Sequence, residues 1–297
     1  MIPATAKAVA LRTKSYMPEA TLSETSYGKS RIRLVRVTRH GDRHELRDFT
    51  VAVAFAGHYD TSYTDGDNRD VLPTDTMKNT VYALAARDGV GEPEAFGRAL
   101  GRHFIERNPK LARVVIDIVD HGWTRIAIGD REHGRAFVRR GPELRVARVV
   151  SGRSTSQVTA GVTDLVIMKT SNSAFAGFPR DEFTTLPETR DRLFVTSLNA
   201  TWTYGEDDVD FAAMFPSVRT TLLETFAQHD SLSVQHTLYA MGQVVLDTID
   251  AVASIRLEMP NRHHLPIDLT RFGMENRNEV FVATEEPHGL ITATLSR

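Results

Sequence analysis

Large apolar side chains alternate with small or polar ones along residues 49–55. In an extended chain this alternation places the large side chains on one face of a strand, and such a face must be buried against another element. Residues 93–108 can supply the element that covers this face, because their apolar residues recur at helical spacing between Pro93 and Pro109. The pattern predicts a sheet covered by a helix, with these residues facing it: Phe49, Val51, Val53 and Phe55.

The order of predicted elements is similar in the two halves of the chain. In the first half, short β-branched runs at 114–119 and 123–128 follow the helix, which predicts the order strand, strand, helix, strand, strand. The second half repeats this order, with strands at 164–169 and 194–204 and helical stripes at 215–226 and 238–249. Closing strands follow at 254–259 and 280–284, and the stretch 291–295 comes after them. We therefore predict an α+β fold with two domains, residues 1–150 and 151–297, joined near 148–157.

Composition excludes several classes of protein. The chain has 297 residues, a length that suits two domains, and Lys+Arg 36 against Asp+Glu 38 argues against a nucleic-acid partner. Cys 0 excludes disulfides, thiolate metal sites and a cysteine nucleophile. Residues Met1 to Ser15 lack the continuous apolar core of a secretory signal, and no window approaches the ~18 apolar residues of a membrane-spanning helix. We expect a cytoplasmic protein without a membrane partner.

Common cofactor motifs are incomplete. Gly28, Lys29 and Ser30 could end a phosphate-binding loop, but Ser23 stands where that loop needs its first glycine. The patterns of zinc proteases, α/β-hydrolases and dinucleotide-binding folds are missing from the sequence. His263 and His264 are adjacent, and adjacent residues of a strand point to opposite faces, so we do not expect them to share a metal. The sequence predicts no metal site.

Three stretches carry more specific information, in this order along the chain. Residues 71–80 contain T-D-x-x-K-N, residues 169–178 contain N-S-x-F-x-G-F, and residues 261–269 begin with N-[KR]-H. Together they resemble the urate oxidase family. Further matching stretches lie at 27–29, 188–192, 233–235 and 287–291, so the resemblance covers nearly the whole chain.

The resemblance implies a fold and a reaction. The expected fold is a tandem pair of tunnelling-fold (T-fold) domains, each an antiparallel sheet backed by helices, assembled into a barrel-like homotetramer. The expected reaction is the cofactor-free oxidation of urate by O2 and water to 5-hydroxyisourate and hydrogen peroxide. Sites in the family lie between subunits. Lys29, Thr74 and Asp75 would come from one chain and most of the remaining pocket from its neighbour.

The resemblance also implies the contacts to substrate. Urate is a flat anion, so Arg192 would present a planar pair of donors, Gln235 would bind the opposite edge, and Phe175 would stack on the ring. Asn261 would hold oxygen, and later the attacking water, above the ring. Backbone groups would make further contacts at Asp75, Val234 and Ile291, and Thr74 belongs to the same substrate pocket.

Three residues match the family's catalytic proton relay: Lys29, Thr74 and His263. A threonine hydroxyl is too weak a base alone, but a neighbouring neutral lysine can take its proton. His263 can then exchange protons with bound water. Taken singly, Lys29 would be interpreted as a solvated lysine and Thr74 as a helix N-cap.

Two alternatives remain open at this point. One is a tunnelling-fold enzyme that acts on a pterin or a guanine nucleotide with a zinc ion held by histidines. The other is a catalytically silent purine-binding protein that kept the fold.

Overall fold

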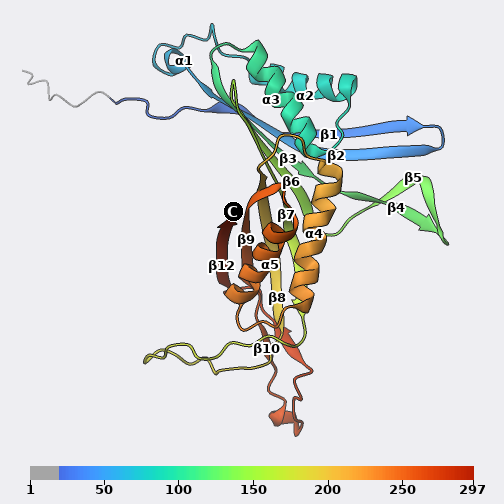
Figure 1. Ribbon diagram of the computed structural model, residues 1–297, viewed down its shortest axis with the longest axis vertical. Helices are drawn as coiled ribbons and strands as arrows, with labels where there is room; N and C mark the ends of the chain where they lie inside the picture. Colours follow the sequence, from blue (N-terminus) through green and yellow to red (C-terminus); the bar gives the residue numbers. More distant parts are fainter. Residues whose placement is uncertain (1–19) are drawn as a thin grey trace, which may run out of the picture.

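The computed structural model describes residues 20–297, so the predicted absence of a signal in Met1 to Ser15 lies outside the described residues (Figure 1). Its main feature is an eight-stranded sheet in which every neighbouring pair is antiparallel. The predicted α+β fold with an antiparallel sheet is thus confirmed. In order across the sheet, the strands are β1 (Tyr27–His40), β2 (Arg43–Gly57), β3 (Leu111–Asp120), β6 (Leu144–Ser151), β7 (Ser156–Lys169), β8 (Phe194–Tyr204), β9 (Val252–Asn261) and β12 (Gly289–Ser296).

One apolar face runs across all of these strands. Directly paired residues share a face, and the register matches Val53 with Ile116 and Ile116 with Val149. In the second half it matches Trp202 with Ile255 and Ile255 with Leu295. These side chains belong to or pack against a single hydrophobic core. The two halves of the chain therefore share one sheet and one core, linked by the turn at residues 152–155.

Four longer helices cover this face (Figure 1). Two pack on the first four strands and two on the last four. At Gly97 a side chain would bring its Cβ to 2.7 Å from Val149 Cγ2, so glycine is what allows its helix to lie against the sheet. None of the helices in residues 20–297 is long and apolar enough to cross a membrane. The four are α2 (Thr74–Asp88), α3 (Pro93–Arg107), α4 (Phe211–Gln228) and α5 (Val234–Thr248).

The structure differs from the prediction where each half closes. The run at 123–128 does not pair with β3, and the one at 280–284 does not close the second half; each lies in a small hairpin of its own. Helix α2 was not among the predicted helices, although Met77, Val81 and Leu84 mark its buried side at helical spacing. The smaller elements are α1 (Asp60–Thr64), β4 (Trp123–Ile128), β5 (Arg131–Arg139), β10 (His264–Pro266), η1 (Thr270–Phe272) and β11 (Phe281–Ala283).

The missed strand β6 has an arginine on its apolar face. Arg145 pairs with Val162 of β7, which is fully buried, and therefore points toward the helices. Its guanidinium bonds Glu92 at 2.5 Å and Glu94 at 2.7 Å, and Glu94 is completely buried. Burial raises the pKa of Glu94, and the charge of Arg145 opposes this rise. A charged residue at a core position concealed the strand pattern, and only its partners at the N-terminus of α3 explain it.

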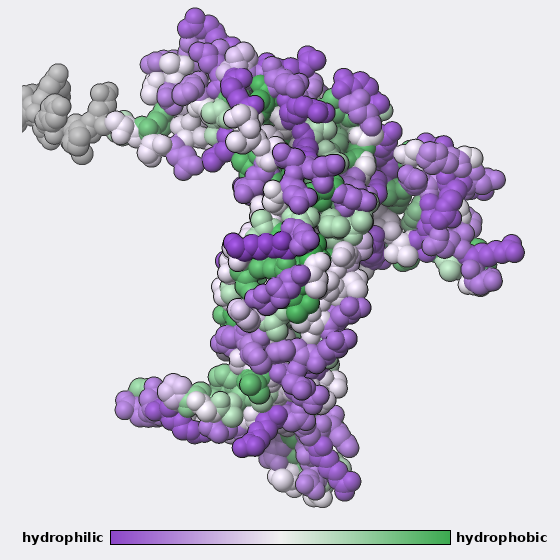
Figure 2. Space-filling view, in the orientation of Figure 1, coloured by the Kyte–Doolittle hydropathy of each residue, from purple (hydrophilic) through white to green (hydrophobic). Residues whose placement is uncertain are grey.

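The β4–β5 hairpin projects from the sheet and its surface is mostly hydrophilic (Figures 1 and 2). At its base, Arg139 Nη2 lies 2.7 Å from His121 Nδ1, and His121 Nε2 lies 2.7 Å from Thr50 Oγ1. A guanidinium can only donate, so Nδ1 must accept and the imidazole must be neutral, with its proton on Nε2. Protonation of His121 would remove this anchor of the hairpin.

We expect acidification to destabilise the fold through His121. Burial, and next the charge of Arg33, lowers the pKa of His121. Between this lowered pKa and the value of about 6.5 in the unfolded chain, the unfolded state binds more protons. The stabilisation is therefore complete above about pH 6.5 and is lost as the pH falls through the folded-state pKa. The measurement is urea unfolding at pH 7 and at pH 5, on either side of the histidine pKa of about 6.5. The free energy of unfolding should fall less over this range for His121→Gln than for wild type.

The variant should keep part of the pH dependence. Burial also lowers the pKa of His103 and of His229, and both contribute with the same sign. Equal slopes for wild type and His121→Gln would contradict the role of His121 as a neutral acceptor.

Candidate active site

Seven of the predicted site residues line one cavity in the second half of the chain. The cavity has a volume of about 440 Å³. It lies at the base of the long loop between β7 and β8, where Figure 2 shows apolar surface. The predicted residues that line it are Phe175, Arg192, Val234, Gln235, Asn261, His263 and Ile291.

Main-chain hydrogen bonds hold Phe175 and Arg192 next to each other. Phe175 and Thr189 exchange two of them, at 2.8 and 3.0 Å, and Arg192 N donates to Ser173 O at 2.9 Å. As a result the Arg192 guanidinium lies 5.3 Å from the centre of the Phe175 ring, on whose surface Phe178 also stacks. A planar cation beside an aromatic ring suits a flat anionic ligand.

Arg192 has no carboxylate within ion-pair distance in the part of the chain that the structure describes. The side chain is half-buried, and this burial lowers the pKa of Arg192 because it raises the cost of the charge. A half-buried cation without a counter-ion is a favourable place for an anion to bind.

The first turn of α5 forms another wall. Ser233 caps the helix, with its Oγ accepting from His236 N at 3.1 Å. Val234 and Gln235 follow, and backbone N–H groups in a first turn have no acceptor within the helix. The helix N-terminus carries partial positive charge, which favours an anion here as well. Both the backbone of Val234 and the side chain of Gln235 can therefore contact a ligand in the cavity.

Two neighbouring strands and the segment after β9 complete the cavity. Asn261 ends β9 and pairs with Gly289 of β12, two residues before Ile291. His263 lies between β9 and β10, where Thr284 N donates to its carbonyl at 2.9 Å. His263 is not part of a strand, so the alternation of strand side chains does not apply to His263 and His264, and both residues line the cavity.

The other predicted residues lie elsewhere in the chain. Lys29 is on β1, and Thr74 and Asp75 begin α2, at the opposite end of the molecule from the β10–β11 hairpin (Figure 1). They belong to neighbouring elements, since α2 packs against β1. The structure thus divides the predicted site into two groups that do not meet within one chain.

The T-D-x-x-K-N motif has a local structural explanation. The Asp75 carboxylate accepts hydrogen bonds from Lys78 and from Asn79 on the next turn of α2, and the Lys78 bond is the main reason that the pKa of Asp75 is lowered. The side chain of Asp75 is therefore held against its own helix. Thr74 is the first residue of α2 and Pro73 occupies the N-cap position, so the N-cap interpretation of Thr74 was wrong.

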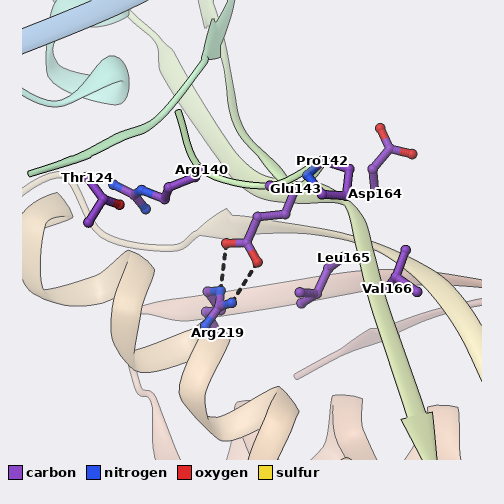
Figure 3. Close-up of a pocket in the computed structure, with 9 residues that line it drawn as sticks. Thr124, Arg140, Pro142, Glu143, Asp164, Leu165, Val166 and Arg219 are labelled. Carbon is purple, nitrogen blue, oxygen red and sulfur yellow. Dashed lines mark hydrogen bonds and ion pairs between the residues drawn. The ribbon is translucent and has the colours of Figure 1, made fainter. Parts of the chain in front are cut away.

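A more open cavity of about 580 Å³ lies where the two halves of the chain meet (Figure 3). Both nitrogens of the Arg219 fork donate to Glu143, at 2.9 and 2.6 Å, so the two charges neutralise each other. None of the predicted site residues lines this cavity.

Comparison with known proteins assigns the chain to a family. The sequence model described as Uricase matches residues 25–150 and 158–292. The chain belongs to the uricase family. It is 42% identical over 279 residues to the uricase of Arthrobacter globiformis, covering 94% of this chain and 91% of the relative. The uricase of Dictyostelium discoideum is 37% identical, covering 94% of this chain and 98% of the relative.

Solved uricase structures have the same fold. The crystal structure of the uricase from Arthrobacter globiformis matches with a TM-score of 0.90, covering 94% of this chain and 96% of that one. A uricase from Bacillus fastidious, at 24% identity, matches with a TM-score of 0.80 over 92% of this chain and 93% of that one. The antiparallel sheet with its helices on one face is therefore shared with uricases of low sequence similarity.

Sequence reasoning missed part of the cavity wall. Pro187 and Leu193 adjoin the matching stretch at 188–192, and Pro266 lies inside the one at 261–269, so these stretches could have pointed to them. Asn278 and Phe281 had no such signal. They reach the cavity only because β11 folds back on β10.

Proposed function

We propose that this chain is a urate oxidase that converts urate, O2 and water to 5-hydroxyisourate and hydrogen peroxide without a cofactor. The supporting observation is the cavity in which the guanidinium of Arg192, without a carboxylate partner among residues 20–297, lies beside the ring of Phe175 and the N-terminus of α5. These groups suit a flat anion whose rim carries oxygens and nitrogens.

In this proposal each cavity residue meets one part of urate. Arg192 donates to one edge, and Gln235, whose amide offers both a donor and an acceptor, binds the opposite edge. Phe175 stacks on the ring, and the backbone of Val234 and Ile291 makes further contacts. Asn261 holds oxygen, and then water, above the ring. The urate dianion is itself the reductant, and its two electrons reduce O2 to peroxide.

Formation of the dianion requires a base. We assign this step to Thr74, whose hydroxyl passes a proton to neutral Lys29, with His263 exchanging protons with water. Asp75 contributes its backbone at the N-terminus of α2. The oxidised purine then adds water at C5, one of the two ring-fusion carbons, which gives the 5-hydroxy product.

We further propose that the site is completed by another copy of the chain in a barrel-like homotetramer. Two observations support this: Lys29, Thr74 and Asp75 lie far from the cavity in one chain, and β1 and β12 are edge strands paired on one side only among the described residues. The two halves, residues 1–150 and 151–297, would be tandem T-fold domains, since each contributes four antiparallel strands and two longer helices.

The direct test follows urate absorbance and dissolved oxygen together after dialysis against a chelator. Simultaneous loss of both, without added cofactor, is the expected result. Urate binding without oxygen consumption would identify a silent relative. Activity that disappears along with stoichiometric zinc would favour the zinc-dependent pterin or nucleotide enzyme.

Mixing two inactive variants tests the shared site. Thr74→Ala chains keep the cavity group intact, and Arg192→Met chains keep the Lys29 and Thr74 group intact. Random pairing across a two-fold interface should restore about a quarter of the sites, because half of the pairs are mixed and each mixed pair has one intact site. Activity should appear after co-refolding and not in either variant alone. A mixture as inactive as its components would contradict a site shared between chains.

A further inference from the structure

We propose that Tyr27 is a positioning residue that sets the distance between Lys29 and Thr74. The inference rests on the proposed function, because it concerns the same proton relay. It comes from three features of β1: its bulge, its close pairing with β2, and a hydrogen bond that Tyr27 accepts from the chain just before α2.

The bulge in β1 places Tyr27 and Lys29 on the side of the sheet that carries the helices. The register shifts between Lys29 and Ile32, where β1 contains one more residue than β2, and Arg31 in the bulge has φ 58°. Without the extra residue, Lys29 would face away from the side on which Ile32 and Leu34 are buried. With it, Lys29 faces the same side as α2.

Close pairing of β1 with β2 fixes the backbone at this point. A Cβ on Gly28 would lie 1.9 Å from the carbonyl oxygen of Val53, so only glycine can occupy the position between Tyr27 and Lys29. The backbone that carries Lys29 is therefore held against the sheet. The distance from Lys29 to Thr74 depends on what holds the beginning of α2.

One hydrogen bond links the two segments. The hydroxyl of Tyr27 accepts from Leu72 N at 3.1 Å. Tyr27 is two residues before Lys29, and Leu72 is two residues before Thr74. Pro73, with φ −55° and ψ 136°, makes the connection from Leu72 to Thr74 stiff. The Tyr27 hydroxyl therefore holds the first residue of α2 relative to Lys29.

The tyrosine ring is itself held in place. It makes edge contacts with Phe55 at 5.7 Å and with Tyr59 at 5.1 Å between ring centres, and Tyr59 is only 3% exposed. Burial, and next the charge of Tyr59, raises the pKa of Tyr27, so the hydroxyl stays protonated. A hydroxyl that does not ionise can accept the bond from Leu72 but does not act as a base. Its role is to hold the relay and not to carry its proton.

Tyr27→Phe tests the role, because it keeps both ring contacts and removes the hydroxyl that accepts from Leu72 N and interacts with the Tyr59 hydroxyl. The expected result is a fall in kcat for urate oxidation of roughly ten- to hundredfold, since small displacements of reacting groups have effects of this size. KM for urate should change much less than kcat, because most of the groups proposed to bind urate, among them Arg192 and Gln235, lie in the other half of the chain. Assays should be run well below the melting temperature, with thermal melts of each variant.

Tyr82→Phe is a matched control. The Tyr82 hydroxyl donates to Arg33 O at 3.1 Å and also links α2 to β1, but further along both elements. We expect this variant to keep its kcat. A normal kcat in Tyr27→Phe, or equal losses in the two variants, would overturn the positioning role. The relay itself would still stand if the wild type oxidises urate and Lys29→Met lowers its kcat. A wild-type protein that does not oxidise urate would overturn the proposed function itself.

Discussion

Thr74→Ala is expected to lower kcat for urate oxidation by roughly 10²- to 10⁴-fold, the range typical of a lost general base. Lys29→Met should have a similar effect, because the threonine hydroxyl can act only if a neighbouring base takes its proton. The double variant should be little worse than either single one, since residues that act as a unit are not additive. Initial rates of urate loss and oxygen consumption measure all three.

Thr76→Ala is the control for this prediction. Thr76 lies in the first turn of α2 like Thr74, but it is exposed and matches no predicted role. Both threonine variants should keep the stability of the wild type to within about 0.5 kcal/mol, as is usual for changes outside the core. Turnover near the wild-type rate in Thr74→Ala and in Lys29→Met would contradict the relay assignment.

Arg192→Met is expected to raise KM for urate and to lower kcat/KM. The fall in kcat/KM should correspond to roughly 2–5 kcal/mol of lost transition-state stabilisation, as when one partner of a buried charged hydrogen-bonded pair is removed. Arg192→Lys should recover only part of the loss, because lysine cannot present two parallel donors in one plane. The fold should tolerate both changes, since Arg192 has no carboxylate partner to leave unpaired within residues 20–297.

Arg190→Met provides the comparison. Arg190 is exposed, lies two residues earlier in the same loop, and does not line the cavity. It should leave KM for urate unchanged. An unchanged KM in Arg192→Met would show that the anion binds elsewhere in the cavity.

Much of the fold followed from local patterns. The alternation from Phe49 to Phe55 correctly predicted β2, and the spacing of Phe96, Leu100 and Phe104 correctly predicted α3. The patterns failed where a distant partner decides the structure. Arg145 occupies a core position in β6 only because Glu92, the N-cap of α3, and Glu94, in its first turn, lie opposite.

The candidate site shows the same division. The matching stretches, by their resemblance to the family, identified the residues around Phe175, Arg192 and Asn261, and the structure brings these together in one cavity. Cavity residues such as Asn278 and Phe281 had no sequence signal, because they arrive through the pairing of β11 with β10. Tyr27 was part of a matching stretch, but its bond to Leu72 crosses 45 positions of the chain and is invisible in a linear pattern.

The sequence by itself determined the family, the helix and strand types of the strongly periodic segments, and the chemical identity of the residues proposed to act on urate. These depend on residue type and on spacing within one turn or one strand. Only the tertiary structure decided which strands pair, which side of the sheet Lys29 faces, and that Lys29 and Thr74 lie apart from the cavity of their own chain. Those properties depend on register, on a single extra residue in β1 and on contacts between segments far apart in sequence. These arrangements are stabilised by packing in the core and not by the conformational preference of any local segment.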